Sequence, residues 1–371
     1  MNKFKLLHIS IIGIILMLLV TVFIIFINHN NQTKTAKTLK VAKVEEKSNN
    51  DFDIAVIEST EQDNISNLTF YNKELEKTRT QEIKLGSMGS PMDIPRIYDK
   101  YMYVVPQGIG NQKELTVILE YDMETDKYKT YDMKQHVINS FAVNGKSIYS
   151  VNTVNDVSII SWFDKSSGNV KTISKKSIYI SNLNLYGDTL YAFAMEKANN
   201  VTKSYLYLID TKSFTITDTI DISGGGQNYS TKIGDYFYFT NQVDKHGQAS
   251  NILTKLNIKD KTILDIKLKD KFPLQILNYN DKLVISHFDR LQRIGNTITI
   301  YDPKTNEQQS VTLECSLEQI FIKDDKLYSM GEDYLCIYSI NNSNFKLLNK
   351  ANVNTKKGNE YFYYLSGFFA K

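Results

Sequence analysis

Four arginines stand out in a chain whose positive charge is otherwise carried by lysine. A guanidinium group binds a carboxylate or a phosphate through two parallel hydrogen bonds, which an ammonium group does not provide. Two of the arginines share the segment "FDRLQRIGNT" from Phe288, a third lies in "DIPRIYD" from Asp93, and "QVDKHGQASN" from Gln242 adds an acid and a histidine. The candidate ligand-binding residues are therefore Arg96, Asp244, His246, Asp289, Arg290 and Arg293. The alternative is that they are solvated charges of exposed loops.

An acidic residue also recurs between pairs of strand-like segments, as Asp302 does in "ITIYDPKTNEQQSVTL". Asp122 and Asp210 occupy the same place in similar segments. Aspartate at the first position of a type I turn accepts hydrogen bonds from the N–H groups of the turn, and proline at the second position fixes φ. Catalytic groups must converge on one substrate, which one carboxylate per repeat does not do. We interpret these residues as turn caps.

Other chemical motifs are incomplete. "DMETDK" from Asp122 lacks the central glycine and the final glutamate of a calcium loop. "GSMGS" from Gly86 and "SGGGQ" from Ser223 do not open a helix, so we interpret them as tight crossovers rather than phosphate-binding loops. The five histidines are scattered, and no HExxH or GxSxG motif occurs. We expect no metal site and assign no catalytic residue.

The chain has two cysteines, Cys315 and Cys336. One disulfide is compatible with an even number of cysteines in an exported domain. However, Cys336 lies inside the strand-like segment "YLCIYSI" and Cys315 lies at the end of another. We therefore favour two separate buried thiols over a disulfide.

Two kinds of segment alternate along the chain at a regular interval. The first is a polar turn followed by a hydrophobic strand; its aligned residues, 42 to 47 positions apart, are Tyr103, Tyr149, Tyr191, Tyr238, Val284 and Tyr328. The second is the capped turn, found at Asn72, Asp122, Asp164, Asp210, Asn257, Asp302 and Ser339. Two markers in phase at about 45 residues, with four strands per repeat, predict an all-β fold, a seven-bladed β-propeller.

The first repeat begins at Asp51 with "DFDIAVIES", which matches a second strand, so its innermost strand is missing. A spare strand, "NEYFYYLSGFFAK" from Asn359, follows the last repeat. We expect this C-terminal strand to complete blade one, because ring closure removes open sheet edges. The predicted propeller domain comprises residues 51–371.

Residues 9–27, "ISIIGIILMLLVTVFIIFI", contain no charged residue. As a helix they would span roughly 28 Å, about the hydrocarbon thickness of a bilayer. With no good cleavage site after them, they predict a transmembrane signal anchor behind a short head of residues 1–8. Residues 28–50 are polar and lysine-rich and predict a flexible linker. The lysines on the two sides are nearly balanced, and the large following domain favours an extracytoplasmic propeller at the cell membrane.

Composition supports this interpretation. The net charge is +3 and charged residues make up 23% of the chain, which argues against a nucleic-acid-binding surface and against a disordered polyelectrolyte. The 24 tyrosines and 18 phenylalanines suit many short strands. Abundant lysine, asparagine and isoleucine indicate an AT-rich genome, and we expect a Gram-positive source.

The segments "LYLIDTKSFTITDTIDI" and "ITIYDPKTNEQQSVTL" resemble the strand-turn-strand unit of bacterial YVTN-type and quinoprotein-like propellers, over residues 51–371. No strand ends in the Trp-Asp dipeptide of WD40 repeats, and "SWFDKSSG" does not match the sialidase Asp-box. The single tryptophan, Trp162, does not supply the repeated docking motifs of quinoprotein dehydrogenases. The resemblance thus implies the fold, and we expect no pyrroloquinoline quinone or other cofactor.

Propellers bind ligands over the central channel, on the face that carries the loops between second and third strands and the crossovers between blades. We call this the long-loop face and the opposite one, with the capped turns, the turn face. The loops from Pro106, Met195, Gln242 and Phe288 look longer than a hairpin needs. We expect a binding or scaffolding module for a protein, a peptide or a cell-envelope glycan. The alternative is a propeller hydrolase or lyase with Asp, His and Arg at the channel mouth.

Overall fold

The computed structural model describes residues 52–60, 64–89, 93–107, 115–198, 201–331, 334–341, 343–353 and 364–371. The head, the anchor and the linker predicted for residues 1–50 lie outside these residues. The described part contains no helix that could span a membrane.

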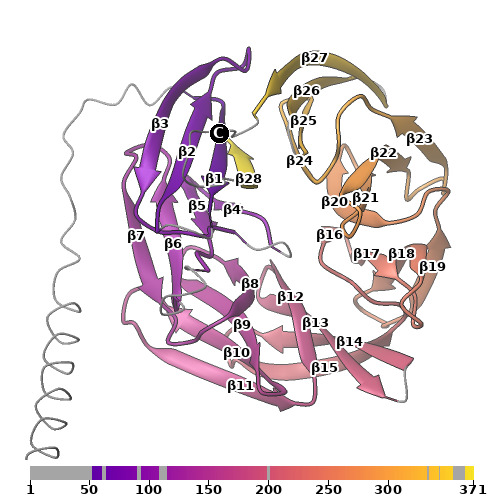
Figure 1. The fold of residues 1–371 in the computed structure, drawn as a ribbon. Coiled ribbons are helices and arrows are strands. Elements are labelled where there is room, and N and C mark those ends of the chain that lie inside the picture. The colour runs from indigo at the N-terminus through magenta and orange to yellow at the C-terminus, as the bar shows by residue number, and fades with distance from the viewer. Residues whose placement is uncertain are drawn as a thin grey trace, which may run out of the picture. The chain divides into compact units, whose positions relative to one another are not determined.

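Its strands form seven four-stranded antiparallel sheets arranged in a ring (Figure 1), which confirms the predicted all-β, seven-bladed propeller. From the inside outwards, blade one contains β28 (Tyr364–Ala370), β1 (Ile54–Ser59), β2 (Ser66–Tyr71) and β3 (Lys77–Ile83). Blade two contains β4 (Arg96–Tyr98), β5 (Tyr101–Val104), β6 (Val117–Asp122) and β7 (Tyr128–Asp132). Blade three contains β8 (Ile138–Val143), β9 (Ser147–Val154), β10 (Val157–Asp164) and β11 (Val170–Lys176).

The remaining blades follow the same order. Blade four contains β12 (Tyr179–Tyr186), β13 (Thr189–Ala198), β14 (Val201–Asp210) and β15 (Thr215–Ile222). Blade five contains β16 (Ser230–Ile233), β17 (Tyr236–Val243), β18 (Ala249–Asn257) and β19 (Ile263–Lys267). Blade six contains β20 (Pro273–Tyr279), β21 (Lys282–Asp289), β22 (Ile294–Tyr301) and β23 (Gln308–Thr312). Blade seven contains β24 (Gln319–Lys323), β25 (Lys326–Met330), β26 (Tyr334–Asn341) and β27 (Asn344–Asn352).

The recurring acidic residues cap turns, as predicted. The Oδ1 atom of Asp302 accepts a hydrogen bond from the N–H of Lys304 at 2.9 Å, and Asp122 and Asp210 accept equivalent bonds from N–H groups two and three residues later. These hydrogen bonds favour the charged form of the carboxylate, so the pKa of Asp302 lies below its usual value. The capped turns join the third and fourth strands of their blades on the turn face.

The apolar core lies between the blades. Each of the seven interfaces between neighbouring blades has its own cluster of buried side chains. The residues of the first sequence marker point into these clusters from the second strand of their blade, and all of them are buried: Tyr103, Tyr149, Tyr191, Tyr238, Val284 and Tyr328. The period of about 45 residues is therefore the period of inter-blade packing.

A second repeating contact joins the innermost strands. In four blades a buried polar side chain accepts a hydrogen bond from a backbone N–H of the next innermost strand. Asp93 accepts from Phe141, Ser140 from Leu183, Gln275 from Ile320 and Gln319 from Phe368. In blade one the equivalent position is Gly367. A Cβ added there would lie 2.5 Å from the side chain of Pro95, so only glycine fits. These contacts tie neighbouring blades together at the ring centre.

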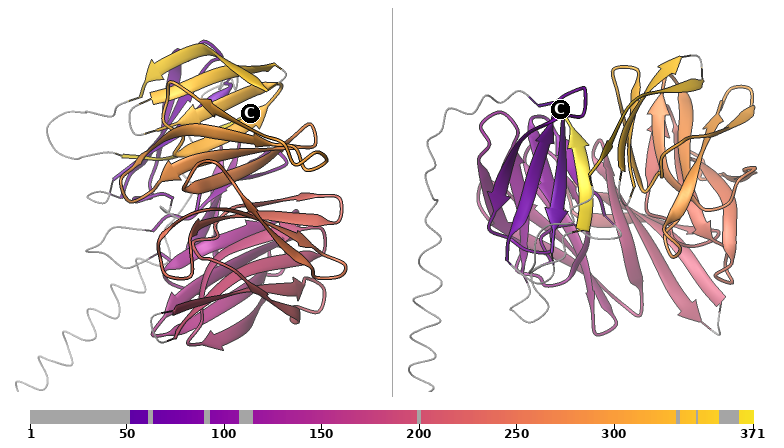
Figure 2. Two further views of the ribbon diagram at one scale, coloured as in Figure 1. Left: turned by 90° about the vertical axis from the view of Figure 1, so that its right-hand side faces the viewer. Right: turned by 45° about the horizontal axis from the view of Figure 1, so that its top comes forward.

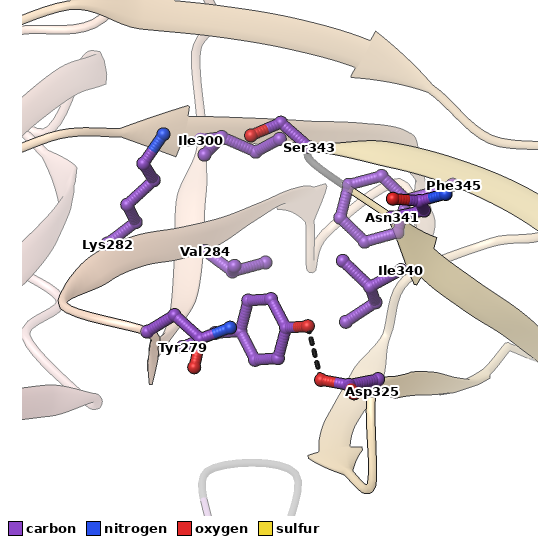
Figure 3. A pocket seen from close by; sticks show the side chains of 10 residues that line it. Tyr279, Lys282, Val284, Ile300, Asp325, Ile340, Asn341, Ser343 and Phe345 are labelled. Atoms are coloured by element: carbon purple, nitrogen blue, oxygen red, sulfur yellow. Dashed lines mark hydrogen bonds between the residues drawn. The ribbon is translucent and has the colours of Figure 1, made fainter.

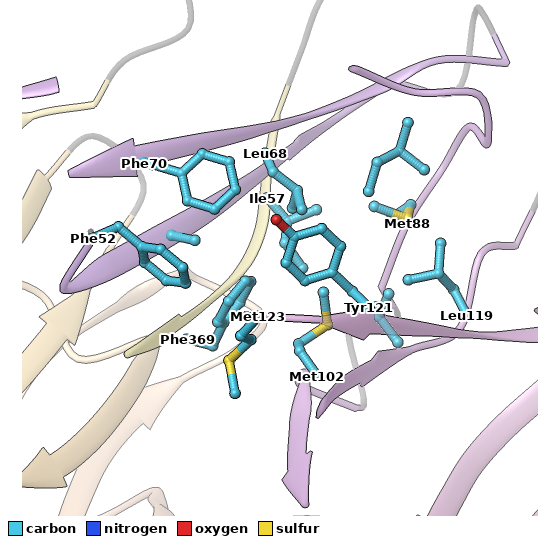
Figure 4. Close-up of a cluster of buried hydrophobic side chains, with 13 residues drawn as sticks. Phe52, Ile57, Leu68, Phe70, Met88, Met102, Leu119, Tyr121, Met123 and Phe369 are labelled. Carbon is cyan, nitrogen blue, oxygen red and sulfur yellow. The ribbon is translucent and has the colours of Figure 1, made fainter. Parts of the chain in front are cut away.

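The ring closes in blade one, as the sequence predicts. β28 pairs with β1 in antiparallel register, with Ile54 opposite Ala370, and the two strands lie side by side in Figure 1 and in the right-hand view of Figure 2. Phe369 of β28 enters the cluster between blades one and two, with its ring centroid 6.1 Å from that of Phe52 and 6.3 Å from that of Tyr121 (Figure 4). On the other side, the side-chain amide of Gln319 donates to the carbonyl of Phe368 at 2.7 Å.

Two expectations were wrong. Cys315 and Cys336 form a disulfide rather than two free thiols. Cys315 lies in the crossover from β23 to β24, next to β26. The N–H of Cys315 donates to the hydroxyl of Tyr338, and the Cα atoms of Cys315 and Cys336 are 6.5 Å apart. The segments from Met195, Gln242 and Phe288 are also not long loops, because the strands around them extend into hairpins, and only residues 244–248 and 290–293 separate β17 from β18 and β21 from β22.

Removing residues 361–371 should abolish cooperative folding, because blade one then loses its innermost strand and the packing of Phe369 between blades one and two. We expect no single thermal unfolding transition by calorimetry and an increase in aggregation. The control is Lys371→Ala, which keeps the strand and removes the cation–π contact of Lys371 with the ring of Phe52. A truncated chain that melts like the full chain would refute closure as a requirement for stability.

Replacing both cysteines with alanine should lower the free energy of unfolding by about 3 kcal/mol, the value expected when a cross-link closes a loop of this order of length. The bond spans 21 positions. Urea unfolding with and without reductant measures the effect. Reductant should shift the midpoint of the wild-type chain and leave that of the double variant unchanged; equal stability of both proteins without reductant would contradict the prediction.

Candidate functional site

Charged and aromatic side chains from four blades meet at the ring centre on the long-loop face. Arg96 begins β4, Tyr229 precedes β16 and Glu318 precedes β24, so each stands where an innermost strand starts. Arg290 follows β21 in the hairpin of blade six. We call Asp93, Arg96, Tyr229, Arg290 and Glu318 the central site. Its members come from blades two, five, six and seven.

Arg96 is held by a buried carboxylate. Its Nε and Nη2 atoms donate to Oδ1 of Asp93 at 3.2 and 3.0 Å, and Nη2 also donates to the hydroxyl of Ser140 at 3.4 Å. Oδ2 of Asp93 accepts the N–H of Phe141 at 3.1 Å. Burial raises the pKa of Asp93, and the charge of Arg96 opposes this shift. Since both oxygens of Asp93 are engaged, this carboxylate orients Arg96 and is poorly placed to act as a general base.

Tyr229 lies between the charges of the central site. Nη2 of Arg290 is 3.5 Å from its hydroxyl, and the guanidinium carbon is 5.8 Å from the centroid of its ring. Burial raises the pKa of Tyr229, while the charges of Arg290 and Arg96 lower it and those of Asp93 and Glu318 raise it. The charges of side chains from three other blades therefore act on Tyr229, and Arg290 contacts its hydroxyl directly.

The hairpin of blade six carries the remaining arginine. Nη2 of Arg293 contacts both oxygens of Glu318, at 3.2 and 2.9 Å. Oδ1 of Asp289 accepts the N–H groups of Leu291 and Gln292, at 2.9 and 3.2 Å, so this aspartate caps its own hairpin. The cap and the ion pair hold the hairpin in a fixed conformation, with Leu291 96% exposed at its tip.

Asp244 and His246 lie elsewhere. They line a cavity of about 570 Å³ formed by β14 and β15 of blade four and β17 and β18 of blade five. Oδ1 of Asp244 accepts the N–H groups of His246 and Gln248, at 2.8 and 2.9 Å, which closes the turn of the blade five hairpin. The described residues contain no group of three or more His, Cys, Asp or Glu side chains arranged to hold a metal ion.

The six candidate residues therefore divide into two places. Arg96 and Arg290 belong to the central site and Arg293 contacts its Glu318, whereas Asp244 and His246 line the cavity between blades four and five and Asp289 caps its own turn. Sequence reasoning missed Asp93, Tyr229 and Glu318. Each of them stands near the start of an innermost strand, a position that recurs with the blade period, and aligning those starts would have identified them.

Exposed hydrophobic side chains also gather on the long-loop face. Among the described residues, those at the strand starts, crossovers and hairpins of this face are Val137, Val154, Tyr179, Leu291, Ile294, Tyr334 and Tyr364. The turn face has a similar number within the described part of the chain: Ile97, Tyr98, Val170, Tyr236, Ile263 and Leu264. Exposed apolar side chains alone therefore do not distinguish the two faces, and the central site is what distinguishes the long-loop face.

Comparisons with known proteins establish the fold. No family model matches the chain, and no curated protein matches it. A functionally unknown protein from Desulfotomaculum acetoxidans has a TM-score of 0.58 at 11% identity, covering 86% of this chain and 98% of its own. KlHsv2 with loop 6CD replaced by a Gly-Ser linker has a TM-score of 0.51 at 11% identity, covering 81% and 99%. The Neurospora crassa Pan2 WD40 domain has a TM-score of 0.50 at 11% identity, covering 83% and 92%. Identities this low show a shared fold alone: a seven-bladed propeller with WD40 neighbours.

Replacing Arg96 with methionine should lower the free energy of unfolding by about 3 kcal/mol, because it leaves the Asp93 carboxylate buried without a counter-charge. Chemical denaturation measures this loss. The double variant Asp93→Asn with Arg96→Met should recover part of the stability, since no buried charge remains. If the single variant is as stable as the wild-type chain, Arg96 is not the partner that compensates Asp93.

Proposed function

We propose that this protein is a membrane-anchored, extracytoplasmic β-propeller that acts as a binding or scaffolding module, with a protein or peptide held on its long-loop face. A cell-envelope glycan is the other ligand that the sequence suggests. The observation that carries the proposal is the central site, with its arginines and Tyr229, next to the exposed Leu291 of the blade six hairpin.

This composition is that of a protein-binding surface. Interfaces between proteins are enriched in aromatic residues and arginine, and a few such residues near the centre supply most of the binding energy. Arg290 and Tyr229 occupy the centre of the face, and Leu291 and Ile294 stand beside them, 96% and 59% exposed.

Two features support the proposed location. Residues 9–27 are long and apolar enough for a signal anchor, and the lysine-rich residues 28–50 would serve as a tether. The disulfide between Cys315 and Cys336 is independent support, because such bonds form and persist in oxidising compartments outside the cytoplasm. The resemblance to YVTN-type propellers is consistent with a bacterial envelope protein.

Site-specific photo-crosslinking tests the proposed face. A photoreactive amino acid at Leu291 in the full chain should crosslink a specific partner in intact cells. The same amino acid at Leu264, 55% exposed on the outer strand β19, is the matched control. Arg290→Ala should weaken the Leu291 crosslink at least about tenfold, the effect of losing a central interface residue. Equal crosslinking from both positions, or a Leu291 adduct insensitive to Arg290→Ala, would remove this face as the binding surface. A glycan adduct would select the other ligand.

A further inference from the structure

At the interface between blades six and seven, the tyrosine that marks the second strand of most other blades is missing. The first sequence marker is tyrosine in blades two, three, four, five and seven, and each of these side chains packs into the cluster shared with the next blade. In blade four, for example, the ring of Tyr191 stacks on Phe237 of blade five with 4.4 Å between centroids. In blade six the marker is Val284, which faces blade seven without a ring.

Blade one also lacks the tyrosine but fills the space. Its equivalent residue is Ala55, paired with Phe70 across β1 and β2. The rings of Phe70 and Phe52, whose centroids are 4.8 Å apart, pack in the same cluster as Ala55. In blade six the residue paired with Val284 is Ile300, so the cross-strand neighbour adds no ring, and the ring that blade six gives to this cluster is that of Tyr279, at the end of β20.

A pocket of about 320 Å³ occupies this interface. Val284 and Ile300 of blade six face Ile340 and Phe345 of blade seven across it (Figure 3). These four walls are apolar, whereas the rim carries Asn280, Lys282, Asn341 and Ser343. The hydroxyl of Tyr279 donates to Asp325 at 2.5 Å and joins the two blades at one end. Because its rim is formed by turns of these blades, the pocket opens on the turn face, away from the central site.

Comparison with blade three shows what the pocket would hold. The side chain of Tyr149 lies near Ser147 and Asn144 of its own blade and near Thr211 of blade four. Thr211 corresponds to Ile340, because the N–H of Thr211 donates to the carbonyl of Asp188 and that of Ile340 donates to the carbonyl of Asp325. Asn144 and Asn280 both begin the turn before the second strand.

The pocket thus lies where a tyrosine side chain stands in the other blades, between groups that correspond to its neighbours there. Its volume is sufficient for a substituted single ring, since a dry cavity of about 150 Å³ binds benzene and ligand pockets generally begin near 300 Å³. We propose that this pocket is a binding site for a small phenolic molecule, with the ring between Val284 and Ile340 and the hydroxyl hydrogen-bonded at the polar rim. This ligand is distinct from the partner on the long-loop face.

The probe is p-cresol, the side-chain analogue of tyrosine, titrated into the full-length protein by calorimetry. Val284→Tyr restores the residue found in the other blades and should occupy the pocket. We expect p-cresol to bind the wild-type chain and to bind the variant about tenfold more weakly, a difference of about 1.4 kcal/mol in binding free energy. We also expect the variant to melt at a higher temperature than the wild-type chain. Val170→Tyr, an exposed position on the outer strand β11, is the matched control and should leave binding unchanged.

Absence of p-cresol binding to the wild-type chain at millimolar concentration would overturn the proposal, and so would equal binding by the wild-type and Val284→Tyr chains. N-acetyltyrosinamide distinguishes the source of the phenol. If it binds and p-cresol does not, the pocket holds a tyrosine of a partner protein and the small-molecule proposal fails. Should Val284→Tyr not fold, Ile300→Phe fills the pocket from the same blade by a smaller change, and the same loss of p-cresol binding is then required.

Discussion

Each blade is a sheet with two apolar faces, and neither face can be covered by the blade itself. Blade four, for instance, gives Tyr207 and Ile209 to the cluster shared with blade three, and Leu206 and Leu208 to the one shared with blade five. Burial of such side chains is the main favourable term in folding. A linear array would leave a face exposed at both ends, so the stacking of blades requires a closed ring, and β28 supplies the strand that closes it.

The inner ring of polar contacts gives this packing its geometry. Asp93, Ser140, Gln275 and Gln319 each bind a backbone N–H of the following blade, so the starts of the innermost strands are held in register around the centre. The central site is built on those starts. Asp93 has both roles, because one of its oxygens joins blades two and three while the other orients Arg96. Residues at the ring centre thus both join neighbouring blades and form the proposed binding surface.

The sequence was informative where the physics is local or periodic. The capped turn at Asp302 depends on residues two positions apart, and the buried tyrosines repeat with the blade. Contacts between distant segments were not accessible in this way. The pairing of Cys315 with Cys336 depends on the path of a crossover, and the position of Tyr229 depends on closure of the ring. The sequence shows Val284 as an exception to the tyrosine repeat. It does not show the pocket, which exists because the side chains of Ile300 and Ile340 also leave this space unfilled.

Closure of blade one by strands from opposite ends of the chain has a consequence for biogenesis. Strand β1 is among the first parts of the propeller to be synthesised and β28 is its last strand, so the ring cannot close until β28 has been made. Until then, β1 presents an unpaired edge, which makes this period the one in which chaperones are most needed.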